Sequence, residues 1–127
     1  MIKLLEKNRW LALIFTLLIT IEIFWFSTLQ GAPGTGGSVW PARIYHFSVF
    51  FLFTIFFLAL IKSDKKIKLK YILITLIISI IHAFLDEFHQ IFVPFRDANM
   101  RDILTDTIGI FTAIIIYFYT DKKINNY

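Results

Sequence analysis

The sequence predicts an all-α membrane protein, a four-helix transmembrane bundle with cytoplasmic N and C termini. Of 127 residues, 57% are hydrophobic and 17% are charged, whereas an average soluble domain is about 45–50% apolar and about 25% charged. A soluble domain of this size could not bury so much apolar surface. Four apolar stretches are each long enough to cross a hydrocarbon core of about 30 Å, and the basic residues are distributed unevenly between their connections.

Composition also excludes several classes of protein. The chain has no cysteine, so disulfides, thiolate metal sites and cysteine nucleophiles are absent. The net charge of +4 is typical of membrane proteins with basic loops. No long basic soluble segment is present to bind nucleic acid, so no nucleic-acid partner is expected. The length predicts a single membrane domain over residues 1–127.

We expect the four transmembrane helices to cover residues 10–29, 44–61, 71–93 and 103–119. Isoleucine and phenylalanine, which are common in them, favour strands in water. In lipid, every backbone N–H and C=O must be satisfied within the segment, and this requirement favours helices. A Gly-rich connection at residues 31–38 and a basic turn at residues 62–70 join the spans. Pro94 is expected to end the third helix, because it cannot donate a backbone hydrogen bond.

The orientation follows from the lysine and arginine residues. Ten of the 13 lie in the N-terminal tail, the second connection and the C-terminal tail, and the remaining three are Arg43, Arg96 and Arg101. The positive-inside rule therefore places both termini and the second connection in the cytoplasm. The first and third connections then face outward.

Polar residues gather toward the outward ends of the spans. At about 100° per residue, His82, Asp86 and His89 fall on one face of the third span. Gln90 lies on the flank of that face, and Glu87 points about 100° away from Asp86. A charge near the bilayer centre costs about 3 kcal/mol, so these residues indicate a functional cavity inside the bundle.

A second stripe lies on the fourth span, where Asp102 and Asp106 precede Gly109 and Ala113 on one face. The two small residues would let this helix approach another closely. On the first span, Glu22 is the one charged residue, and it could share the depth of the acids on the third span.

Motifs for several kinds of chemistry are missing or incomplete. His82-x3-Asp86-x2-His89 could face one metal ion, but it lacks the metalloprotease pattern His-Glu-x-x-His. We expect neither a metal nor another cofactor. The sequence contains no Gly-x-Ser-x-Gly elbow, no P-loop and no dinucleotide fingerprint, and no residue is assigned a catalytic role.

Three blocks of sequence resemble the VanZ-like family of small membrane proteins. They are Arg43-Ile-Tyr-His46-Phe47, Asp86-Glu87-Phe-His-Gln90-Ile-Phe-Val-Pro94-Phe-Arg96, and Asp102-Ile-Leu-Thr-Asp106-Thr-Ile-Gly109. Phe26-Ser27 at the end of the first span is also similar to the family. Asp106 departs from the pattern, which more often has Asn at that position. The resemblance covers residues from about 10 to 118.

The resemblance implies a multi-pass protein of the cell envelope, in the plasma membrane. The founding member of the family is associated with low-level resistance to the glycopeptide antibiotic teicoplanin. The resemblance implies no settled biochemical activity, so whether the protein is an enzyme stays open.

The leading hypothesis is a polar pocket, open to the outside, that binds or modulates a lipid head group or a lipid-linked, anionic envelope component. Arg96 and Arg43 would bind a phosphate or carboxylate by bidentate hydrogen bonds, and Glu87 or Asp102 would orient the guanidinium group. The candidate pocket residues are Arg43, His46, Glu87, Gln90, Arg96, Asp102 and Asp106. Secondary candidates are Glu22, His82, Asp86 and His89.

Two alternatives stay open. The first is a membrane-embedded acid/base enzyme that acts on a lipid-linked phosphate or ester, with His46 as proton shuttle. It lacks an obvious nucleophile. The second is a proton or ion pathway through Glu22, His82 and Asp86. Against it, the inner half of the bundle carries almost no ionisable residues. The lipid bilayer is the expected environment, and the oligomeric state is left open.

Overall fold

The computed structural model describes residues 2–29, 40–63, 66–96 and 98–125, and over these residues it is helical without any strand. The helices are α1 (Ile2–Lys7), α2 (Arg9–Thr28), α3 (Trp40–Lys62), α4 (Leu69–Gln90) and α5 (Met100–Asn125). The last four are long and apolar enough to cross a membrane. The all-α class and the four membrane spans are therefore confirmed, while the cytoplasmic location of the termini stays a prediction.

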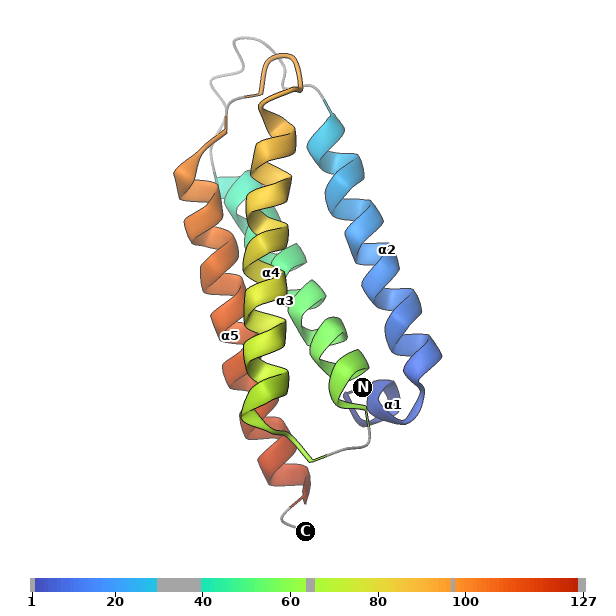
Figure 1. Cartoon of the computed structure of the whole chain (residues 1–127). Coiled ribbons are helices and arrows are strands. Elements are labelled where there is room, and N and C mark those ends of the chain that lie inside the picture. The colour runs from blue at the N-terminus through green and yellow to red at the C-terminus, as the bar shows by residue number, and fades with distance from the viewer. Residues whose placement is uncertain (1, 30–39, 64–65, 97, 126–127) are drawn as a thin grey trace.

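The four long helices run up and down beside one another, and α1 lies across one end (Figure 1). We call the end that carries both termini the lower end and the opposite end the upper end. Helix α3 contacts every other helix, whereas α2 and α5 make no contact among the described residues. The side chains that α3 turns inward are therefore the ones on which a site inside the bundle can be built.

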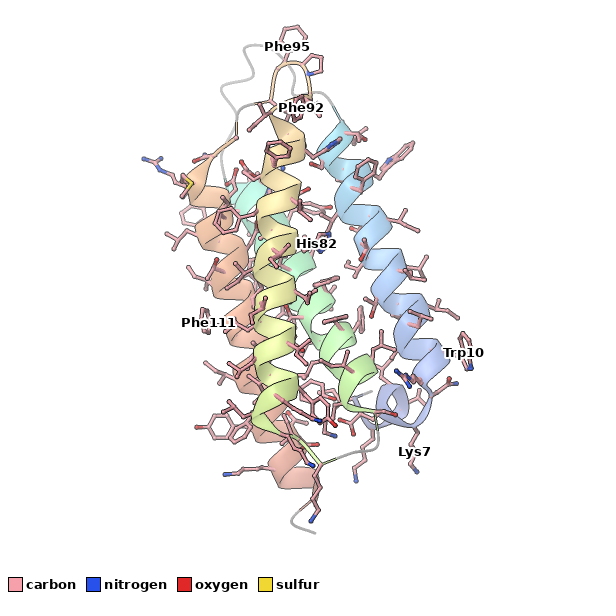
Figure 2. All side chains as sticks on the ribbon, viewed as in Figure 1. Lys7, Trp10, His82, Phe92, Phe95 and Phe111 are labelled. Carbon is pink, nitrogen blue, oxygen red and sulfur yellow. The ribbon has the colours of Figure 1, made fainter. Side chains whose placement is uncertain are left out.

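Large apolar side chains cover the outside of the bundle, as expected for helices that contact hydrocarbon. Trp10 is 75% exposed, and Figure 2 shows Trp10 and Phe111 pointing away from the bundle. Inside, one apolar cluster surrounds Tyr117 toward the lower end. A second cluster surrounds Phe50 and Phe53 farther up. These two clusters make up the apolar core, and the buried polar side chains lie beside them.

Two prolines shift helix boundaries from their predicted positions. Helix α3 begins at Trp40 rather than residue 44, because Pro41 fits the first turn, where its missing N–H is not needed. Helix α4 ends at Gln90 rather than residue 93. Pro94 cannot donate to the Gln90 carbonyl four residues earlier, and Val93 N donates to that oxygen instead, at 3.1 Å. The proline therefore ends the helix one turn before its own position.

Helix α1 was not expected from the sequence. The chain breaks at Asn8, whose side-chain oxygen accepts from Leu11 N at 3.1 Å and caps α2. The break lets α1 fold back over the lower end and bury Leu5 and Glu6. The Gly-rich connection predicted at residues 31–38, part of the basic turn, and Asp97 lie outside the described residues.

Helices α3 and α5 approach each other closely at Gly109. A Cβ atom built there would lie 2.6 Å from the Phe47 carbonyl oxygen, which is closer than any side chain tolerates. Ala113, one turn farther along, is also fully buried. The predicted close approach of the small-residue stripe is confirmed.

Candidate functional site

The contact between α3 and α5 pairs His46 with Asp106. The distance between His46 Nδ1 and Asp106 Oδ1 is 3.0 Å, and the two residues are 4% and 0% exposed. Phe47 follows His46, and Gly109 lies one turn after Asp106, so the close backbone contact sets the spacing of the pair. A carboxylate on Nδ1 fixes the tautomer and orientation of an imidazole and leaves Nε2 for a ligand or a proton.

A cavity of about 110 Å³ lies beside this pair, at the upper end between α2, α3 and α4. We call it the upper cavity. Within it, Gln90 Nε2 donates to Asp86 Oδ2 at 3.1 Å. Its lining residues are Ile23, Phe26, Ser27, Ala42, Tyr45, His46, Asp86, Gln90 and Arg96. The fold therefore gathers four predicted residues here: His46, Gln90 and Arg96 from the main set, and Asp86 from the secondary set.

Two hydroxyl groups at the upper cavity have no hydrogen-bond partner among the described residues. They are Ser27 Oγ and Tyr45 OH, and both atoms are buried; Ser27 as a whole is 3% exposed. A buried polar group without a partner costs about 1–3 kcal/mol. A polar group that entered the cavity could recover part of this cost.

Arg96 is carried to the cavity by the turn that follows α4. Arg96 N donates to Val93 O at 3.2 Å, with Pro94 second in the turn and Phe95 third at a φ of 63°. This pattern is typical of a type II β-turn. The turn places the guanidinium of Arg96 at the end of α2.

The guanidinium binds the last carbonyls of α2. Arg96 Nη2 donates to Phe26 O at 2.8 Å and Nε donates to Leu29 O at 3.1 Å. The expectation was that Glu87 or Asp102 would orient the arginine, and the structure gives it these backbone partners instead. Nη1 has no hydrogen-bond partner in the described part of the chain. Arg96 thus ties α4 to α2 and retains donors for a ligand.

Glu87 faces another cavity, between α4 and the beginning of α5. Its Oε1 accepts from Asn99 N, and it lines a space of about 240 Å³ together with Phe88 and Met100. Asp86 and Glu87 therefore serve different neighbours, as their 100° separation predicts. Glu87 does not line the upper cavity with His46 and Arg96.

Three further predicted residues do not line the upper cavity. Arg43 is half-buried, with its guanidinium 5.6 Å from the centroid of the Trp40 ring. Asp102 is half-buried in the first turn of α5. Glu22 is half-buried on α2. The arginine that the cavity uses is Arg96 alone among the residues described.

A larger cavity of about 420 Å³ opens between α2 and α4, and we call it the α2–α4 cleft. His82, Asp86 and His89 all line it, which confirms that they share one face of α4. Figure 2 shows His82 on the side of α4 that faces α2. No three acidic or histidine side chains among the described residues gather closely enough to hold a metal ion.

Comparison with known families agrees with this arrangement. The family model described as VanZ/LLP1 matches residues 9–121, which include α2, α3, α4 and most of α5. The chain belongs to the VanZ/LLP1 family. No curated protein matches the chain, and no solved structure matches it. Together with the four spans, the match identifies a multi-pass membrane protein, and the family name implies a link with antibiotic resistance.

Two residues of this VanZ/LLP1 protein, Ser27 and Tyr45, were missed as site candidates, although Tyr45 lies within the block Arg43-Ile-Tyr-His46-Phe47 that resembles the family. Ser27 is on α2, far from the polar blocks of the sequence, and an isolated serine carries no signal of function. The one available signal for Ser27 was the similarity of Phe26-Ser27 to the family. The structure brings its hydroxyl to the same cavity as His46.

A second buried polar group lies at the lower end, where sequence reasoning was wrong. Lys62 Nζ lies 2.8 Å from Glu6 Oε1 and 2.8 Å from Asp121 Oδ1, and Lys62 is 2% exposed. Tyr117 OH donates to Glu6 Oε1. The inner half of the bundle was expected to hold almost no ionisable residues, and Lys62 was assigned to a basic turn. The fold of α1 over the lower end buries these charges, and the sequence does not reveal that fold.

Proposed function

We propose that this VanZ/LLP1 protein binds the polar head group of an envelope lipid, or of a lipid-linked envelope component, in the upper cavity. The observation that carries the proposal is a pair of buried hydroxyls, Ser27 Oγ and Tyr45 OH, that have no hydrogen-bond partner in the described part of the chain and lie beside Arg96 and Asp86. Bundle packing alone gives no reason to bury two unpaired hydroxyls next to a guanidinium. A polar ligand supplies one.

The groups around the upper cavity favour a particular head-group chemistry. Arg96 Nη1 and the two hydroxyls can donate to the oxygens of a phosphate or carboxylate. The Asp86 carboxylate can accept from a hydroxyl or an ammonium group on the same ligand. His46 Nε2 adds one more polar contact. We infer an anionic head group that also carries a hydrogen-bond donor.

The size of the upper cavity and the side of the membrane on which it is expected to lie both support the same ligand class. A cavity of about 110 Å³ accepts several water molecules or one group of phosphate size, whereas a glycopeptide antibiotic is far larger. A contribution to resistance would therefore act through an envelope component. The upper end carries three arginines, whereas the other ten basic residues lie elsewhere in the chain. This distribution favours a location of the upper end at the outer face of the plasma membrane.

The test uses the full chain, purified from its membrane in mild detergent, with bound lipids identified by mass spectrometry. Ser27→Ala combined with Tyr45→Phe removes only the two unpartnered hydroxyls. The matched control combines Ser48→Ala with Tyr119→Phe, because Ser48 bonds within its own helix and Tyr119 is exposed. We expect a lipid that wild type and control retain to be depleted about tenfold in the cavity variant. Equal retention in all three proteins would contradict the proposal.

Arg96→Ala is a second variant, and its readout needs a stability control. This change also removes the two hydrogen bonds to the end of α2. The melting temperature in detergent is therefore measured beside lipid retention. We expect loss of the lipid even at temperatures well below the melting transition, and full retention there would count against a role for the guanidinium.

A membrane-embedded enzyme is a second candidate, and the His46–Asp106 pair favours it. Asp106 holds one nitrogen of His46 at 3.0 Å, and Ser27 lines the same cavity as the imidazole. Nucleophile, base and orienting carboxylate are the elements of acyl-transfer catalysis. Hydrogen bonds between nucleophile and base are often long before substrate binds.

In this reading, Ser27 Oγ bonds to an ester carbonyl carbon while His46 Nε2 takes the hydroxyl proton. The alcohol then leaves with that proton, and water releases the acyl group from Ser27. The test is turnover of a panel of lipid esters by purified protein. Turnover that Ser27→Ala and His46→Ala both abolish would support the enzyme, and no turnover across the panel would contradict it.

A further inference from the structure

The upper cavity lies next to the α2–α4 cleft. The two spaces share Ile23 and Asp86 as lining residues. The remaining lining of the cleft is largely apolar, from Ile21 and Phe24 on α2 and Leu85 on α4. A molecule in the upper cavity could therefore extend directly into an apolar space.

The cleft overlaps the upper cavity in depth and reaches about one helical turn deeper into the bundle. On α2 the cleft is lined by Thr20, Ile21, Ile23 and Phe24 and the cavity by Ile23, Phe26 and Ser27. On α4 the lining of the cleft runs from His82 to His89 and that of the cavity from Asp86 to Gln90, so the lower limit of the cleft is three to four residues deeper on both helices. A shift of three to four residues along a helix is about 5 Å. In a glycerophospholipid the ester groups lie a comparable distance below the phosphate.

Two imidazoles line the cleft, which also contains Thr20 and the carboxylate of Asp86. His82 packs its ring against Phe53, with centroids 4.6 Å apart, and His89 packs against Phe24, also at 4.6 Å. Neither His82 Nδ1 nor His89 Nε2 has a hydrogen-bond partner among the described residues. Each nitrogen carries a hydrogen in one of the two neutral tautomers and can then donate to a carbonyl oxygen.

We infer that the α2–α4 cleft holds the ester groups and the first methylenes of a glycerol-based lipid, with His82 donating to the deeper ester carbonyl and His89 to the ester carbonyl nearer the head group. This inference rests on the proposed binding of the head group in the upper cavity. It selects between two classes of envelope lipid. An acyl-glycerol lipid has ester carbonyls at the required depth, whereas a polyprenyl phosphate continues from its phosphate directly into hydrocarbon.

The test is competition between lipids that share one head group. The full chain in detergent is mixed with equal amounts of a diacyl phosphatidylglycerol and its dialkyl ether analogue, which lacks the two carbonyls, and bound lipid is measured by native mass spectrometry. A polyprenyl phosphate is added in a separate arm. We expect wild type to prefer the ester over the ether by about fivefold, the effect of one or two net hydrogen bonds. The polyprenyl phosphate should bind no better than the ether.

The variant His82→Phe combined with His89→Phe keeps the ring packing and removes both donors. We expect it to bind the ester and ether lipids equally. Thr112→Val is the control, because that hydroxyl bonds within α5, to Ile108 O, and the control should keep the preference. Should the double variant fail to fold, the wild type is crosslinked to a lipid with a photoreactive group next to the ester, and the expected crosslinks are to Phe24 and Leu85.

The outcomes separate this inference from the proposal on which it rests. Equal binding of ester and ether by wild type, together with loss of both in Ser27→Ala/Tyr45→Phe, would overturn the cleft assignment and leave the head-group site standing. A preference that survives removal of both imidazoles would also overturn it. Undiminished binding by Ser27→Ala/Tyr45→Phe would overturn the head-group site itself.

A second groove provides an internal check. Arg9, Trp10, Leu13, Leu60 and Ile61 line a space of about 560 Å³ at the lower end, between α2 and α3. Any lipid held there would be insensitive to changes at His82 and His89. Trp10→Ala should therefore leave the preference for the ester lipid unchanged. Loss of that preference in Trp10→Ala would show that the lower groove, and not the α2–α4 cleft, selects the ester lipid.

Discussion

Neighbouring carboxylates in this protein have different surroundings because of the direction in which each side chain points. Asp86 lies between the upper cavity and the α2–α4 cleft. Glu87 instead accepts a hydrogen bond from the backbone N–H of Asn99, just before α5. Asp106 is buried with His46 as its partner. The side-chain type alone therefore does not decide what a carboxylate does here. Its position on the helix surface and the helix that it faces decide it.

The departure of Asp106 from the Asn of the family pattern leads to a prediction. Asp106 Oδ1 accepts from His46, and Oδ2 has no hydrogen-bond partner among the described residues. Asp106→Asn keeps the accepting oxygen, so we expect its free energy of unfolding to stay within about 1 kcal/mol of wild type. Asp106→Leu leaves His46 Nδ1 unpaired and should cost about 1–3 kcal/mol. Unfolding in mixed micelles measures both, and equal stability of the two variants would contradict the pairing.

At the scale of helices, the contact between α3 and α5 holds the site together. Gly109 allows the α5 backbone to approach the Phe47 carbonyl, and the same approach brings Asp106 to His46. Arg96 ties the turn after α4 to the end of α2. The first contact joins α3 to α5 and the second joins α4 to α2, and the upper cavity lies between α2, α3 and α4.

Gly109→Ala is predicted to disturb stability and site together. The added methyl would lie 2.6 Å from Phe47 O, and backbone can move away only by separating α3 from α5. We expect a loss of about 1–3 kcal/mol in the free energy of unfolding, and weaker lipid retention as His46 and Asp106 separate. Ile108→Ala is the control on the exposed face of the same helix. A Gly109→Ala protein as stable as the control would show that the approach is not needed.

The lower polar cluster provides a prediction for α1. Lys62→Met leaves Glu6 and Asp121 buried close together without the cation that joins them, which should cost about 3–5 kcal/mol. Lys66→Met is the matched control, since Lys66 is exposed. Unfolding in mixed micelles measures the loss. Proteolysis of the N-terminal segment should also accelerate in Lys62→Met only, and similar behaviour of the two variants would contradict a role for the cluster in holding α1.

At the scale of the whole molecule, the two ends of the bundle have different polar interiors. The lower end holds a closed cluster in which Lys62 satisfies Glu6 and Asp121. The upper end holds a cavity with two buried hydroxyls that find no partner among the residues described. In the paired cluster, removal of one partner is costly because it leaves a buried charge behind, whereas buried polar groups without partners favour binding of a polar ligand. The proposed function belongs to the upper end for this reason.

The predicted orientation can be tested directly because the chain contains no cysteine. Single substitutions Lys66→Cys, at the lower end, and Phe95→Cys, at the upper end, each introduce one exposed thiol. In intact cells, a membrane-impermeant maleimide should label Phe95→Cys and should label Lys66→Cys only after permeabilisation. The reverse pattern would place the upper cavity in the cytoplasm and overturn the outer-face assignment.

The sequence by itself determined the class and the number of spans. Span length and apolar composition fix a membrane helix because lipid leaves the backbone no other way to satisfy its hydrogen bonds. Helical periodicity also predicted that Asp86 and Glu87 would diverge and that Gly109 would permit a close contact, since both depend on spacing within one helix. The family likeness came from short motifs within the spans.

Only the tertiary structure decided which residues meet. The pairing of His46 with Asp106, the recruitment of Ser27, and the exclusion of Glu87 from the upper cavity all depend on how helices distant in the sequence rotate and approach. The burial of Lys62 depends on α1, and this helix of six residues is too short to be predicted from hydrophobic periodicity. Periodicity fixes the faces of a helix, but packing between helices selects which faces are joined, and that selection depends on side-chain shape over the whole bundle.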